Sequence, residues 1–200
     1  MEIFELDENI KVLYKNLKKE PFFVNVPSMN YITYHGVGHP SENDFQMACE
    51  ALFSLSYTIK FKIVRPKLNI DYKVNPMEID WFLDKSKGKT SYSWVMMIMQ
   101  PIFVTKKLCE EAIIMLKASK PEVNYSKVSF EIIKYGKCIQ CFHLGDYLKM
   151  NDTLEKMVKY GKINKYDTES FTHDVYLNDS RKTRVENLKT IMRIKIIESK

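Results

Sequence analysis

Asp174 and Tyr176 have side chains and spacing suited to a functional pair. The run from Phe171 to Leu177 alternates in a way that predicts a β-strand, and side chains two residues apart on a strand point to the same face. A carboxylate on a buried face is costly unless it is paired or binds something. Two interpretations stay open at this point: a plain strand whose polar face is wet, and a buried acidic site.

Aromatic residues on other predicted strands or strand ends could form the walls of such a site. Aromatic faces attract cations and stack on flat molecules, whereas the alternative for any one ring is packing in the core. A carboxylate among these rings would suit a large, planar or cationic ligand. The predicted ligand contacts are Asp174 together with Trp81, Trp94, Tyr135, Tyr147 and Tyr176.

Motifs for metals, phosphates and nucleic acids are missing from the sequence. Cys138 and Cys141 have Cys-x-x-Cys spacing, but on a strand they fall on opposite faces, and no second Cys/His pair lies at zinc-finger distance. No phosphate loop, nucleophile elbow or His-Glu-x-x-His helix occurs. The basic residues between Arg181 and Lys195 fit a solvated face, and no nucleic-acid module is visible. We therefore expect no metal, no cofactor and no nucleic-acid partner.

Composition points to an ordinary globular protein. The 200 residues carry a formal charge of +6, and the N-terminus is acidic where a secretion signal would be basic. No apolar run approaches the roughly 18 residues that span a membrane. Four cysteines without an export signal predict reduced thiols and a cytoplasmic location. Monomer and homodimer both stay open.

Local signals place the elements around the candidate site. Ser41 and Thr105 are predicted N-caps of two helices. Residues 128–143 form two alternating runs around Gly136 and are predicted as two strands that turn there. The stretch 84–91, rich in Lys, Ser and Gly, is predicted as the loop of an earlier hairpin.

The order of these elements contains an internal repeat. A strand at Tyr31–Gly38 followed by an apolar helix recurs as a strand at Cys138–Gly145 followed by an apolar helix, and each copy continues into two more strands. The predicted fold is α+β: a duplicated strand–helix–strand–strand module with pseudo-two-fold symmetry, antiparallel sheets and a ligand cleft between the repeats. We expect one domain over residues 1–200, with repeats at about 22–100 and about 127–197 and a connecting helix at about 104–120.

Several stretches resemble one known family over most of the chain, from about Pro21 to Ile196. The sequence is similar to the GyrI-like small-molecule-binding family in its stand-alone bacterial form. The stretches that carry the resemblance are Leu52–Lys60, Asp71–Glu78, Trp94–Pro101 followed by Phe103–Thr105, and His173–Asp179 with Arg181.

The resemblance implies both a fold and a range of functions. The family's fold is the duplicated module, shared with effector domains of multidrug-sensing transcription regulators and with the gyrase inhibitor protein. Its pocket is aromatic, holds a central glutamate and binds varied hydrophobic, often cationic compounds. Some stand-alone members resemble hydrolases of cyclopropane-bearing, DNA-alkylating natural products, in which the glutamate directs water onto the strained ring.

The family's His-Glu-Ile-Tyr-Leu pattern falls on residues 173–177, and Asp174 stands where the glutamate is usual. The resemblance thus gives Asp174 the role of general base and Tyr176 that of proton donor or orienter. The aspartate reaches roughly 1.5 Å less far, and base catalysis requires hydrogen-bond reach of about 2.6–3.2 Å.

Three hypotheses follow from these residues and this resemblance. The preferred one is a cytoplasmic protein that sequesters or senses hydrophobic, cationic small molecules. The second is a cyclopropanoid cyclohydrolase that detoxifies alkylating natural products, so the sequence alone leaves open whether the protein is an enzyme. The third is a protein-binding inhibitor of the gyrase-inhibitor type.

Overall fold

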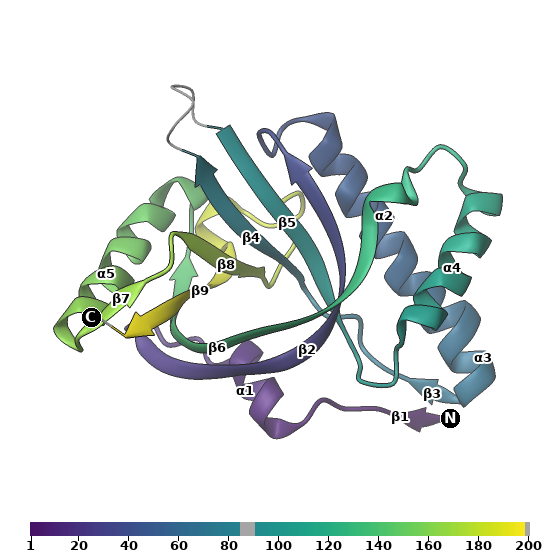
Figure 1. Cartoon of the computed structure of the whole chain (residues 1–200), viewed down its shortest axis with the longest axis horizontal. Coiled ribbons are helices and arrows are strands. Elements are labelled where there is room, and N and C mark those ends of the chain that lie inside the picture. Colours follow the sequence, from purple (N-terminus) through teal and green to yellow (C-terminus); the bar gives the residue numbers. More distant parts are fainter. Residues whose placement is uncertain (85–90, 199–200) are drawn as a thin grey trace. The chain divides into compact units, whose positions relative to one another are not determined.

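The computed structural model describes residues 1–84 and 91–198, and Figure 1 shows the course of the chain. The chain forms two compact units, each assembled from three separate segments. The first unit comprises Met1–Leu6, Met29–Asn75 and Leu83–Ile133, and the second comprises Asp7–Ser28, Pro76–Phe82 and Lys134–Lys200. Three strands contribute residues to both units: β2 (Phe22–Val37), β4 (Met77–Asp84) and β6 (Val128–Leu144).

The first unit combines an antiparallel strand pair with several helices. The C-terminal half of β2 pairs with β5 (Ser91–Gln100), and the short β1 (Glu2–Ile3) pairs in parallel with β3 (Ile70–Asp71). Helix α2 packs against β5 and against α4, and the two helices run side by side in Figure 1. The helical elements are α2 (Asn43–Thr58), the π-helix η1 (Ile59–Val64), α3 (Arg65–Leu68), α4 (Lys106–Ser119) and the 3₁₀ turn η3 (Tyr125–Lys127).

The two predicted helix caps have different outcomes. Thr105 is the N-cap of α4, and its Oγ1 accepts a hydrogen bond from the Leu108 N–H at 3.4 Å, which confirms the prediction. The predicted cap at Ser41 is wrong, because α2 begins at Asn43 with Glu42 in the cap position. The reason is local: the Ser41 backbone N–H and hydroxyl are both bonded to Nδ1 of His39.

The second unit is built on an antiparallel sheet in which β8 (Phe171–Tyr176) pairs with both β4 and β9 (Lys189–Glu198). Strand β9 also pairs with the C-terminal half of β6 and with β7 (Tyr166–Thr168). Its helical elements are α1 (Glu8–Lys15), α5 (Met150–Ile163) and the 3₁₀ turns η4 (Tyr147–Lys149) and η5 (Val185–Asn187). The mixture of helices and antiparallel strands confirms the predicted α+β class, whereas duplication of the module stays a prediction.

Residues 128–143 form one strand rather than the predicted pair that turns at Gly136. Strand β6 continues from Val128 to Leu144 and passes through Gly136 at a φ of +72°. Glycine adopts this left-handed conformation without steric cost, so it interrupts the alternation without reversing the chain. The loop predicted at 84–91 lies almost entirely outside the described residues.

Helices cover the two faces of the second unit's sheet, and we name each face after its helix. On the α5 face, Cys141 of β6 and Met192 of β9 pack against Met157 of α5. On the α1 face, Val175 of β8 and Ile191 of β9 pack against Tyr14 of α1. Both faces of this sheet are therefore buried over its central strands, so neither provides the wet polar face of a simple half-exposed strand.

Candidate functional site

Strand β8 has buried polar side chains on both of its faces. His173 is 2% exposed, Asp174 3% and Val175 0%. Asp174 is paired with Met192, which places it on the α5 face, and the alternation of a strand places His173 on the α1 face. The interpretation of Asp174 as a residue on a wet face is therefore wrong.

On the α1 face, His173 lies between two buried carboxylates of β4. Its Nδ1 is 2.7 Å from Oδ1 of Asp80, and its Nε2 is 2.7 Å from Oε2 of Glu78. Only the doubly protonated ring donates from both nitrogens. Burial alone would lower the pKa of His173, but the hydrogen bonds to Asp80 and Glu78 outweigh burial and raise the pKa to about 9. His173 is therefore an imidazolium ion at neutral pH.

Two phenols complete the partners of these carboxylates. The hydroxyl of Tyr135 donates to both oxygens of Asp80, at 3.0 and 2.9 Å. The hydroxyl of Tyr14, from α1, donates to Oε1 of Glu78 at 2.7 Å. Burial raises the pKa of Tyr135 far above its ordinary value, with the negative charge of Asp80 adding to the effect. Tyr135 is therefore a permanent donor.

Arg193 supplies a second buried cation on the α1 face. Its Nη1 is 3.8 Å from Oε2 of Glu78. Its Nε donates to Oε1 of Gln140 at 2.9 Å, and its Nη2 donates to the backbone oxygen of Leu13 in α1 at 2.8 Å. Two carboxylates and two cations therefore balance within one buried network, and this network fastens α1 to the sheet.

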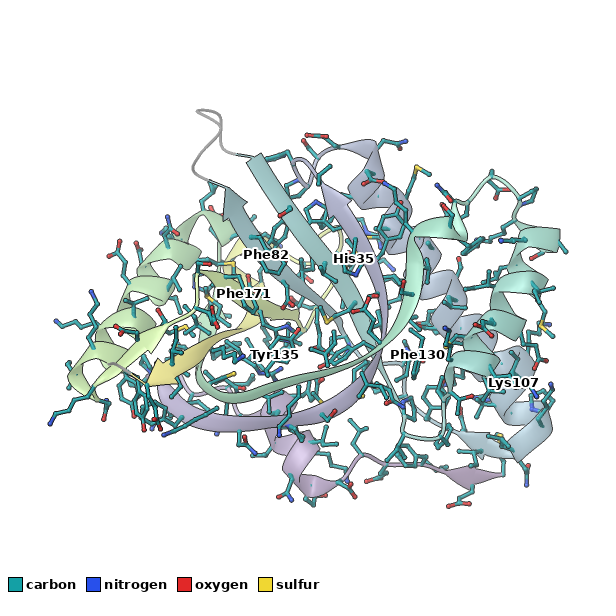
Figure 2. The ribbon with its side chains drawn as sticks, in the orientation of Figure 1. His35, Phe82, Lys107, Phe130, Tyr135 and Phe171 are labelled. Atoms are coloured by element: carbon teal, nitrogen blue, oxygen red, sulfur yellow. The ribbon has the colours of Figure 1, made fainter. Side chains whose placement is uncertain are left out.

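An aromatic pair extends the same face. Phe82 of β4 is paired with Phe171 of β8 in the sheet register, and their ring centroids are 4.9 Å apart. Figure 2 labels both rings, together with Tyr135 from β6. The Tyr135 ring lies 4.4 Å from the imidazole of His173, so the predicted contact residue Tyr135 belongs to the α1 face.

On the α5 face, by contrast, the carboxylate of Asp174 lacks a full set of partners. Its Oδ1 is buried and has no hydrogen-bond partner among the described residues. Its Oδ2 accepts one long hydrogen bond, 3.4 Å, from Oγ1 of Thr172. Burial raises the pKa of Asp174 to about 7, and the charge of Asp80 adds to this shift while that of His173 opposes it. A carboxylate in this position can exchange a proton near neutral pH.

Three of the predicted aromatic contact residues form a cluster on the side of β8 that carries Asp174. Tyr176 is two residues further along β8 on the same face, and its hydroxyl accepts a hydrogen bond of 2.9 Å from Nε1 of Trp81. The ring of Tyr147, in η4, meets the Tyr176 ring edge-on, with centroids 5.6 Å apart. Burial raises the pKa of Tyr176 well above its ordinary value. All three side chains are partly exposed, so this aromatic cluster reaches the surface of the second unit.

The remaining predicted contact residue, Trp94, lies in the first unit. It is 1% exposed, and its ring packs against those of Tyr34 and Phe45, with centroid distances of 6.1 and 5.2 Å. Its Nε1 donates to the Gly38 backbone oxygen at 3.2 Å. A side chain at Gly36 would collide with the indole ring. The surroundings of Trp94 within its own unit are those of a core residue.

Sequence reasoning missed Glu78 and Asp80 as members of a buried cluster, and its placement of Arg193 on a solvated face is wrong, because Arg193 is 1% exposed. The available signal was the alternation of Glu78 and Asp80 with apolar residues on one strand, which places two carboxylates on one face. Among the described residues no cluster of His, Cys, Asp or Glu is arranged to hold a metal ion. Within that same part of the chain, no helix is long and apolar enough to cross a membrane.

Comparison with known proteins identifies the class that this fold represents. The model of the GyrI-like small molecule binding domain matches residues 19–197. The chain therefore belongs to the GyrI-like family, which confirms the resemblance found in the sequence. No curated protein matches the sequence significantly.

Three solved structures illustrate the relationship. One hydrolase from Listeria innocua is 28% identical, with a TM-score of 0.82 over 92% of this chain and 95% of its own. Another structure of a hydrolase from the same organism is 27% identical, with a TM-score of 0.85 over 98% of this chain and 100% of its own. The C-terminal domain of EcmrR shares the fold, at 11% identity and a TM-score of 0.54 over 90% of this chain and 98% of its own.

Proposed function

We propose that this GyrI-like domain binds hydrophobic, positively charged small molecules at Asp174 and so sequesters or senses drugs or toxins. The single observation that carries the proposal is the buried Oδ1 of Asp174, which lacks a hydrogen-bond partner among the described residues and lies on the face that carries Trp81, Tyr147 and Tyr176. The family's function as a small-molecule-binding domain supplies the framework for this proposal.

The physical reason is the cost of leaving such an oxygen unpaired. A buried polar atom without a partner destabilises the protein by about 1–3 kcal/mol, and by more when it is charged. A cation that reaches Asp174 removes this cost, and partly exposed rings beside it offer their negative faces to the same ligand. Ligand binding is therefore favoured, because it removes the cost of the unpaired oxygen in the empty site.

The experiment compares a flat cation with its neutral counterpart, using 2-naphthylmethylammonium and 2-naphthylmethanol in isothermal titration calorimetry. We expect the cation to bind at least ~10-fold more tightly, because charge-assisted hydrogen bonds contribute about twice as much as neutral ones. The Asp174→Asn variant should lose this preference. Asp167→Asn is the matched control, because Asp167 is an exposed carboxylate of the same unit. Equal affinity for both compounds in the wild type would overturn the proposal.

A second candidate function is the hydrolysis of cyclopropane-bearing toxins, favoured by the similarity to two structures described as hydrolases. In this scheme Asp174 takes a proton from water while the water oxygen bonds to a ring carbon. The electron pair of the broken C–C bond passes into the conjugated system of the substrate, which Tyr176 protonates. A pKa of about 7 suits Asp174 to accept a proton at neutral pH.

Ring opening of a spirocyclopropane compound, followed by absorbance, distinguishes the two functions. Turnover by the wild type and by Asp167→Asn, with loss in Asp174→Asn, would establish the hydrolase. Saturable binding without product would exclude the hydrolase and support the binding function.

A further inference from the structure

Thr190 provides a second unsatisfied polar atom on the face that carries Asp174. Thr190 lies on β9, is 0% exposed, and its Oγ1 has no hydrogen-bond partner within the described part of the chain. Native proteins satisfy nearly all buried polar atoms, so two exceptions on one face require an explanation.

The sheet register makes Thr190 and Asp174 near neighbours. Thr190 is paired with Tyr176, and Asp174 is paired with Met192, so Thr190 and Asp174 are diagonal neighbours on the α5 face. Diagonal neighbours on one face of an antiparallel pair have Cα atoms about 7–8 Å apart and Cβ atoms closer than that. Two side-chain oxygens that extend toward each other from such positions can bond to the same nitrogen atom.

The neighbour of Thr190 across the strand pair on β6 already has its own partners. His143 stands opposite Thr190 across the β6–β9 pair. However, its Nδ1 is bonded to Oγ1 of Thr153 in α5 at 2.8 Å, and its Nε2 is bonded to the backbone oxygen of Asp146 at 3.0 Å. Both ring nitrogens are used, so His143 does not satisfy the Thr190 hydroxyl.

We propose that the ligand is a primary or secondary ammonium ion on a flat hydrophobic body, which donates one N–H to Oδ1 of Asp174 and another to Oγ1 of Thr190. The proposal rests on the proposed binding function and specifies the head group. Two acceptors require at least two N–H donors on the same nitrogen. Primary and secondary ammonium ions have them, tertiary ones have a single donor, and quaternary ions have none.

The alternative head group is a quaternary cation held by charge and aromatic contact alone. Such an ion would leave Oδ1 of Asp174 and Oγ1 of Thr190 without hydrogen bonds, because it has no donor. Unpaired buried groups of a binding site are the strongest source of discrimination between similar ligands. A preference of the protein for ammonium ions with N–H donors would therefore distinguish hydrogen bonding by these two oxygens from a general attraction for cations.

The test uses 2-naphthylmethylammonium and its N,N,N-trimethyl counterpart, which share the ring system and the charge. Affinities are measured by calorimetry at about pH 8, where an aliphatic amine stays protonated. We expect the primary ammonium ion to bind the wild type at least ~10-fold more tightly, the effect of one charge-assisted hydrogen bond or more.

Two substitutions at Thr190 separate its hydroxyl from its shape. Thr190→Val keeps the shape of the side chain. It should lower the affinity for the primary ammonium ion about 5- to 10-fold, because one hydrogen bond is lost, and change the affinity for the quaternary ion less than about 2-fold. Thr190→Ser keeps the hydroxyl and should retain the preference. The thermal unfolding temperature of Thr190→Val should be unchanged or raised, because the lost hydroxyl has no partner within the described residues.

Equal or tighter binding of the quaternary ion by the wild type would overturn the inference while leaving the proposed function intact. An equal loss of affinity for both ions in Thr190→Val would also overturn the inference. If neither ion binds the wild type, the proposed function fails and the inference fails with it. Should Thr190→Val not fold, the ligand pair on the wild type and on Thr190→Ser still decides the matter.

Discussion

The two faces of the second unit's sheet both carry buried carboxylates, yet they differ in how these carboxylates are satisfied. On the α1 face, Glu78 and Asp80 are bonded to His173 and to two phenols. On the α5 face, Asp174 keeps one oxygen without a partner among the described residues. Nη1 of Arg193 on the α1 face also has no hydrogen-bond partner within the described residues, but it lies 3.8 Å from Oε2 of Glu78 and so keeps an ionic partner. The comparison teaches that burial of an acidic residue does not by itself mark a functional site, whereas a buried carboxylate oxygen without a partner points to one.

The balance of charge explains why the α1 face is a structural cluster. Glu78 and Asp80 contribute two negative charges, and His173 and Arg193 contribute two positive charges within the same network. Buried ions whose charges compensate one another are tolerated, whereas removal of one member leaves an uncompensated charge. We therefore assign a stabilising role to the α1 face, and the α5 face is where we propose that the ligand binds.

The largest effect should follow from breaking the α1 cluster. His173→Leu leaves Glu78 and Asp80 buried without their shared cation and should lower the free energy of unfolding by about 3–5 kcal/mol. Urea unfolding followed by circular dichroism measures this loss. Asp174→Asn, on the adjacent residue of β8, is the matched control and should not lose stability. A loss below about 1 kcal/mol in His173→Leu would contradict the assignment.

The two faces should also differ in the pH range over which each affects stability. The folded protein keeps the proton of Asp174 up to a pKa of about 7, whereas the unfolded chain releases it near 3.8. Stability should therefore fall as pH rises from about 4 to 7. Asp174→Asn should abolish this fall, so the variant is the more stable protein at pH 8 and gains nothing at pH 4.

The charge of His173 affects stability over a higher pH range. Its folded pKa of about 9 exceeds the ordinary 6.5, so its contribution is complete below about pH 6.5 and is lost as pH rises to about 9. Unfolding free energies of wild type, Asp174→Asn and His173→Leu across both ranges test the two assignments together. A fall between pH 4 and 7 that survives in Asp174→Asn would contradict the role of this carboxylate.

A smaller effect should separate two tyrosines that occupy opposite faces. Tyr135→Phe removes the donor to Asp80 and should cost about 1–3 kcal/mol of stability without changing ligand affinity. Tyr176→Phe removes the acceptor of the Trp81 N–H, a partly exposed group, and should cost less stability but weaken ligand binding. Urea unfolding and calorimetry on both variants give the comparison. A loss of ligand affinity in Tyr135→Phe with a larger loss of stability in Tyr176→Phe would contradict the roles given to the two faces.

The sequence predicts some of these features well, because they depend on local spacing. Alternation around Asp174 predicts its strand and places Tyr176 on the same face, and the spacing after Thr105 predicts the cap of α4. The grouping of Trp81 and Tyr147 with Tyr176 agrees with the predicted ligand contacts, but their role as contacts stays a prediction.

The α1 cluster could not be predicted in the same way. Asp80 and His173 are 93 residues apart, and only the register of β4 against β8 brings them together. Gly136 shows a related difficulty, since a glycine between two alternating runs is compatible with a turn and with a continuous strand. Pairing between distant strands decides such cases, and one sequence does not encode it in a readable local pattern.

The most direct test of the central claim is the affinity of Asp174→Asn for 2-naphthylmethylammonium, measured by calorimetry beside wild type and Tyr135→Phe. Our account predicts at least ~10-fold weaker binding in Asp174→Asn, the loss of a charge-assisted contact, together with unimpaired folding and wild-type affinity in Tyr135→Phe. Wild-type affinity in a folded Asp174→Asn protein would contradict it.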